Sequence, residues 1–83
     1  MIVIYGSKLC KDCVACLEDL DRAGVVYEYR DFSEDLMWLK NFLQLREKDS
    51  VFAEAREKGM IGIPCIVKET GELTLDWEEW INK

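Results

Sequence analysis

Four cysteines carry the reactive chemistry of this 83-residue sequence, which contains no histidine. Cys10, Cys13 and Cys16 crowd into one short segment, and Cys65 follows much later. Two cysteines separated by two residues can alternate between a dithiol and a disulfide, or can supply part of a metal site. Without histidine, catalytic triads, Cys/His pairs and imidazole ligands are excluded, so thiolate and carboxylate chemistry remain.

The pair Cys10 and Cys13 lies where a predicted strand gives way to a predicted helix. A β-branched and aromatic run over residues 2–5 predicts the strand, and apolar or sulfur side chains recur at helical spacing from Lys11 onward. A helix N-terminus stabilises a thiolate, which is the nucleophile in disulfide exchange. We therefore predict that Cys10 attacks a disulfide and that Cys13, inside the first helical turn, is the shielded resolving thiol.

Periodicity, turn residues and caps define the other elements of the chain. We predict a first helix that stops at Gly24, a strand over residues 25–30, a helix capped by Ser33 that runs to about Glu47, a short helix from Asp49 or Ser50 to near Gly59, hairpin strands over 61–67 and 73–75, and a terminal helix capped by Asp76. This order predicts one α/β domain over residues 1–83, with a mixed four-stranded sheet flanked by helices. Right-handed crossovers make the first two strands parallel neighbours.

Charge and composition restrict the partners. The formal net charge is -6 and no cluster of lysine and arginine occurs, which argues against nucleic acid. No apolar run approaches the roughly 20 residues that a membrane-spanning helix needs. Crowded cysteines would close only tiny disulfide loops, so free thiols in a reducing compartment are expected. A cytoplasmic monomer is the resulting prediction.

The strand, the Cys-x-x-Cys pair, the helix and the later apolar-proline pair Ile63-Pro64 resemble a glutaredoxin of the thioredoxin superfamily. The resemblance covers essentially the whole chain and implies a thioredoxin-like, glutaredoxin-type sheet. It implies that Pro64 is cis and faces the cysteines, and that the backbone of Ile63 pairs with substrate. It also implies a redox-active centre: a thiol–disulfide oxidoreductase of electron transport and cell redox homeostasis.

The implied substrate is a disulfide-containing protein or a small-molecule thiol, and we place Lys8 with Ile63 and Pro64 at the substrate site. No cofactor is implied. Lys11 and Asp12 replace the proline and tyrosine usual between glutaredoxin cysteines, and the glycine pair that holds glutathione in that family is missing near residues 73–77. Glutathione and a reductase therefore both stay open as electron donors.

Cys16 and Cys65 allow three interpretations. Each can be a small buried core residue, because free cysteine is often fully buried. Each can instead serve as an accessory resolving thiol near the pair Cys10 and Cys13. The alternative function is a zinc or iron–sulfur protein in which all four thiolates are ligands.

Overall fold

The computed structural model describes residues 1–81. Its elements are β1 (Ile2–Gly6), α1 (Lys11–Arg22), β2 (Tyr27–Asp31), α2 (Leu36–Lys48), the 3-10 helix η1 (Ser50–Phe52), α3 (Ala53–Lys58), β3 (Cys65–Val67), β4 (Leu73–Thr74) and α4 (Trp77–Ile81). The predicted order of strands and helices is confirmed. None of the helices within residues 1–81 has the length and apolar content that a membrane crossing requires.

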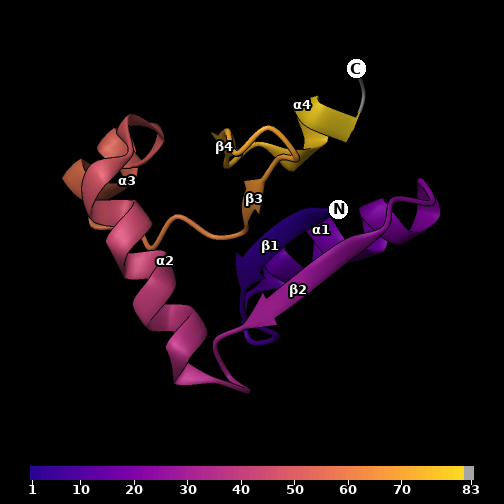
Figure 1. Ribbon diagram of the computed structural model, residues 1–83, viewed down its shortest axis with the longest axis horizontal. Helices are drawn as coiled ribbons and strands as arrows, with labels where there is room; N and C mark the ends of the chain where they lie inside the picture. The colour runs from indigo at the N-terminus through magenta and orange to yellow at the C-terminus, as the bar shows by residue number, and fades with distance from the viewer. Residues whose placement is uncertain (82–83) are drawn as a thin grey trace.

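The four strands form one mixed sheet in the order β2-β1-β3-β4. β1 and β2 are parallel, with Ile4 opposite Tyr29, which confirms that the first two strands are parallel neighbours. β3 runs antiparallel to both β1 and β4, and Cys65 lies opposite Tyr5. The sheet therefore carries the end of β1, and with it the start of α1, next to the start of β3 (Figure 1).

Helices cover both faces of the sheet, so the molecule has three layers (Figure 1). Alternate residues of β1 face opposite sides, because successive side chains of a strand point in opposite directions. The buried cluster on the side of α1 and α4 consists of Ile2, Ile4, Cys16, Leu20 and Ile66. The buried cluster on the side of α2, η1 and α3 consists of Tyr5, Phe42, Phe52, Cys65 and Leu73.

The helix caps agree with the sequence prediction at two positions and differ at one. Asp49 accepts from the N–H of Val51 at 2.9 Å, and Asp76 accepts from the N–H of Glu79 at 3.1 Å. The predicted cap Ser33 is wrong: Asp35 caps α2, and Ser33 Oγ lies 2.9 Å from Ser7 Oγ. Either residue suits an N-cap, and the turn after β2 selects the later one.

The predicted strand over residues 61–67 is shorter in the structure, where β3 begins only at Cys65. Gly62 has a φ of 92°, which is outside the range of a strand. Pro64 has no backbone N–H to donate to a ladder. Residues 60–64 are therefore an apolar loop whose backbone groups are not used by the sheet.

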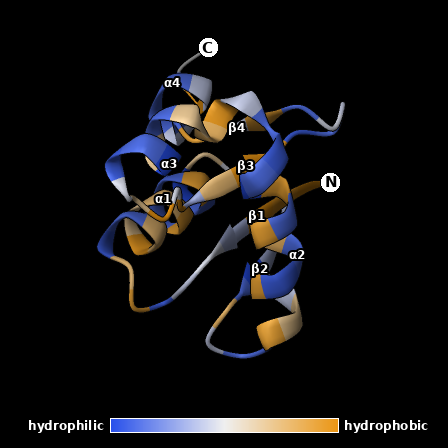
Figure 2. Ribbon diagram, turned by 90° about the vertical axis from the view of Figure 1, so that its left-hand side faces the viewer, coloured by the Kyte–Doolittle hydropathy of each residue, from blue (hydrophilic) through white to orange (hydrophobic). Residues whose placement is uncertain are grey.

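Short groups of apolar and polar residues follow one another along α2 (Figure 2). Phe42 is fully buried against the sheet, whereas Leu36, Met37 and Leu43 are exposed. The apolar arc of this helix is thus wider than the stripe that the sheet covers.

Candidate functional site

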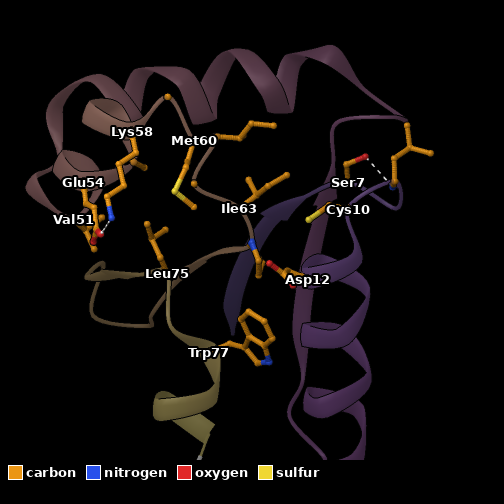
Figure 3. A pocket seen from close by; sticks show the side chains of 16 residues that line it. Ser7, Cys10, Asp12, Val51, Glu54, Lys58, Met60, Ile63, Leu75 and Trp77 are labelled. Atoms are coloured by element: carbon orange, nitrogen blue, oxygen red, sulfur yellow. Dashed lines mark hydrogen bonds and ion pairs between the residues drawn. The ribbon is translucent and has the colours of Figure 1, made fainter.

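A cavity of about 850 Å³ opens beside Cys10 (Figure 3). One wall is the loop after β1 with the first turn of α1, and the opposite wall is α3 with the loop that precedes Pro64. The residues that line it are Ser7, Leu9, Cys10, Asp12, Val51, Glu54, Ala55, Lys58, Gly59, Met60, Ile61, Gly62, Ile63, Pro64, Leu75 and Trp77. Segments far apart in the sequence thus meet at one cysteine.

A tight turn places Cys10 at the start of α1. The N–H of Cys10 donates to the carbonyl of Ser7 at 3.0 Å, and the N–H of Leu9 donates to Ser7 Oγ at 3.1 Å. Cys10 is the N-cap of α1, and its Sγ accepts a hydrogen bond from the N–H of Cys13 at 3.3 Å. An N-cap acceptor is favoured as an anion because of the unpaired N–H groups and the dipole of the helix. Cys10 is half-buried, so it combines access to the cavity with a hydrogen bond from the first turn of α1.

Cys13 lies behind Cys10 and is fully buried. Burial, with a smaller contribution from the side chain and charge of Cys10, raises the pKa of Cys13 to about 12. Gly6 makes this packing possible: a Cβ there would lie 2.7 Å from Cys13 Sγ. The pair is thus asymmetric, with an accessible sulfur in front and a protonated thiol behind it.

Cys16 and Cys65 do not line the cavity. Both are fully buried, in the clusters on opposite faces of the sheet. Burial raises the pKa of Cys16 to about 12 and that of Cys65 to about 12, so both are held as thiols. Within residues 1–81, no group of three or more cysteine, aspartate or glutamate side chains is arranged to hold a metal ion. The structure does not assemble the four-cysteine metal site considered as the alternative.

Ile63 and Pro64 line the cavity opposite Cys10, and the peptide bond between them is cis. Both residues therefore share the cavity with Cys10, and their role toward substrate stays a prediction. Lys8 is exposed in the turn before Cys10 and is absent from the residues that line the cavity. Of the three residues assigned to substrate, Ile63 and Pro64 line the cavity together with Cys10, and Lys8 does not.

The cavity presents mainly apolar side chains. Leu9, Met60 and Ile61 are 84%, 57% and 59% exposed. The charges of Glu54 and Lys58 offset each other in an ion pair of 2.6 Å, and Asp12 adds a carboxylate. The surface beside Cys10 is therefore suited to uncharged, apolar groups.

Arg46 of α2 holds the apolar loop in place. Its guanidinium donates to the carbonyl of Ile61 at 2.9 Å and to that of Met60 at 2.5 Å. Gly62 packs against Phe52, because a Cβ at this position would lie 2.8 Å from that ring. The loop of residues 60–64, which forms the wall opposite Cys10, is thus held in place by contacts with α2 and η1.

Sequence reasoning missed Leu9, Met60, Trp77 and the glycines that allow close packing. Ile61 reads as the start of a strand, since an apolar run has the same appearance in a core and in a binding wall. The signal that could have separated them is Gly62 followed by Pro64, which interrupts a strand.

Comparison with known proteins identifies relatives of the chain but no described activity. No protein-family model matches the chain, and no solved structure matches it. A protein of Haemophilus influenzae, described as uncharacterized, is 30% identical over 74 residues, which span 89% of this chain and 86% of the relative. The chain therefore belongs to the same family as this Haemophilus influenzae protein.

Proposed function

We propose that the chain is a glutaredoxin-like thiol–disulfide oxidoreductase with a thioredoxin-like fold, whose redox couple is Cys10 and Cys13. The supporting observation is the asymmetry of the pair. Cys10 Sγ faces the cavity and accepts the N–H of Cys13, while Cys13 is buried one helical turn behind it. This arrangement suits a nucleophile followed by a resolving thiol.

The reaction takes place in two exchanges. The Cys10 thiolate attacks one sulfur of a substrate disulfide, which forms a mixed disulfide with Cys10 and expels the other substrate sulfur as a thiolate. Cys13 then loses its proton and attacks Cys10 Sγ, which forms the Cys10–Cys13 disulfide and expels the second substrate sulfur. That sulfur leaves as a thiol, since it receives the equivalent of the proton lost by Cys13. Two electrons have passed from the protein to the substrate.

The first exchange prepares the second. Burial is the largest cause of the raised pKa of Cys13, and the hydrogen bond and the charge of Cys10 add to it. Once Cys10 is bound in the mixed disulfide it carries no negative charge, and that contribution ends. Cys13 therefore ionises more readily when its attack is required than in the free dithiol.

The apolar cavity supports a disulfide-containing protein as substrate. Lys58 is the cation among the described lining residues, and it is bonded to Glu54, so an anionic ligand such as glutathione meets a competing carboxylate. A thiol pool, including glutathione, or a reductase would return the electrons. All four cysteines are free, which suits a reducing compartment such as the cytoplasm, and the proposed working form is a monomer.

The proposal is tested by the stoichiometry of reduction of 4,4′-dithiodipyridine, a small uncharged disulfide. We expect two molecules of thiopyridone for each reduced protein molecule, the first from attack by Cys10 and the second from resolution by Cys13. Mass spectrometry should then find the two residues linked. Release of a single molecule with a stable adduct on Cys10 would contradict a dithiol mechanism.

A charged substitution in the apolar loop should selectively lower the activity toward protein substrates. Ile61→Lys places a charge where an apolar side chain of the substrate would dock, and we expect kcat/KM for a peptide disulfide with apolar flanks to fall about 5- to 10-fold, equivalent to roughly 1 kcal/mol of lost apolar burial. Leu36→Lys is the matched control, because Leu36 is 74% exposed on α2 and does not line the cavity. Equal losses in both variants would exclude the loop as the docking wall.

A further inference from the structure

The hydroxyl of Tyr29 is a buried polar group without a partner. Tyr29 Oη has no hydrogen-bond partner within residues 1–81, although the atom is inaccessible to solvent. Buried hydroxyl groups are almost always paired, because an unmade hydrogen bond costs the full desolvation of the group. Such an exception calls for a reason, and the location of this hydroxyl supplies one.

The hydroxyl and the resolving thiol both lie beside Gly6, without a hydrogen bond between them. A Cβ built on Gly6 would be 2.7 Å from Cys13 Sγ and 3.1 Å from Tyr29 Oη, so the sulfur and the oxygen flank the same point on β1. Burial raises the pKa of Tyr29, and the negative charge of Cys13 is the next largest cause. The phenol therefore stays protonated and retains a hydrogen that it can donate.

A second tyrosine on the same strand face shows the usual arrangement. Tyr27 Oη donates to Asp21 at 2.8 Å, at the edge of the molecule. Tyr29 has a carboxylate in its neighbourhood, since the charge of Asp31 also raises the pKa of the phenol, yet no hydrogen bond joins them. Of these two tyrosines of β2, Tyr29 is thus the one whose hydroxyl hydrogen is not used in a hydrogen bond.

We propose that Tyr29 is a positioning residue for resolution, whose hydroxyl donates a hydrogen bond to the Cys13 thiolate as that thiolate forms. The inference rests on the proposed thiol–disulfide exchange. Tyr29 keeps its proton throughout: Cys13 loses its own proton, attacks Cys10 Sγ, and the departing substrate sulfur leaves as a thiol. A hydrogen bond to a charged acceptor is stronger than one to a neutral thiol, so the contact stabilises the attacking state more than the resting dithiol.

The experiment follows both molecules of thiopyridone from 4,4′-dithiodipyridine in stopped flow, with the wild type and Tyr29→Phe. We expect the first release to keep its rate, because the hydroxyl of Tyr29 makes no hydrogen bond to Cys10. The second release should slow about tenfold, the scale of one hydrogen bond to a charged group. The midpoint of chemical denaturation should stay the same or rise, since the substitution removes an unpaired buried hydroxyl.

Tyr27→Phe is the matched control, because it removes a hydroxyl from the same strand away from the pair. An unchanged second release in Tyr29→Phe, or equal slowing in both variants, overturns the inference. A wild type that releases only one molecule instead contradicts the proposed function itself. If Tyr29→Phe does not fold, 3-fluorotyrosine at position 29 tests the same point: its more acidic hydroxyl should speed the second release, and an unchanged rate overturns the inference.

Discussion

Cys10→Ser should abolish disulfide reduction, with a loss of at least about 1,000-fold, because the substitution removes the nucleophile itself. Cys13→Ser should have a different effect: Cys10 still attacks, and the reaction then stops at the mixed disulfide. Thiopyridone release measures both variants directly, with about zero molecules expected from the first and one from the second. The adduct on Cys10 in Cys13→Ser should be stable enough for mass spectrometry.

Cys16→Ala and Cys65→Ala are the controls for this pair. Both cysteines are fully buried and neither lines the cavity, so each variant should still release two molecules at nearly the wild-type rate. Loss of the second molecule in Cys65→Ala would show that Cys65 resolves the mixed disulfide in place of Cys13. Loss of the first molecule in Cys16→Ala would show that the nucleophile has been misassigned.

Gly62→Ala should destabilise the fold more than any other single addition of a methyl group to the cavity wall. The backbone of Gly62 has a φ of 92°, which costs a residue with a Cβ about 1–2 kcal/mol. The new Cβ would also lie 2.8 Å from the fully buried ring of Phe52, which adds about 1–3 kcal/mol of overpacking. Urea denaturation measures the sum.

Gly71→Ala separates these two causes. Gly71 has almost the same backbone conformation, with a φ of 91°, but nothing lies within 4 Å of the position of its Cβ. We expect Gly71→Ala to lose only the part of the folding stability that is due to the backbone conformation. Equal losses of stability in Gly62→Ala and Gly71→Ala would mean that the contact with Phe52 adjusts freely and that the wall is not rigid.

The local parts of the fold could be predicted from the sequence because their signals are local. The junction of strand and helix at Cys10 depends on neighbouring residues, and so do the caps Asp49 and Asp76. The parallel pairing of β1 and β2 followed from the handedness of crossovers. The exchange of Ser33 for Asp35 as a cap shows the limit, since two suitable residues stand two positions apart and only the turn after β2 selects one.

The composition of the site depended on tertiary contacts that no local pattern records. The face of the sheet that Cys65 occupies follows from its pairing with Tyr5 in the register of β3 with β1. Tyr29 also depends on tertiary contacts: its place on a strand face was predictable from the sequence, but its unpaired hydroxyl was not. Nonlocal packing thus decides which of the four thiols are buried and which one is accessible.

The central claim is that Cys10 and Cys13 form one redox couple, and a redox titration tests it most directly. Metal-free protein is equilibrated in thiol buffers of defined potential, free thiols are trapped by alkylation, and the sites are mapped by mass spectrometry. We predict one reversible two-electron transition confined to Cys10 and Cys13, with Cys16 and Cys65 unoxidised at every potential. If Cys10 and Cys13 never become linked, or if oxidation scrambles all four thiols, the assignment of this pair as the redox centre is wrong.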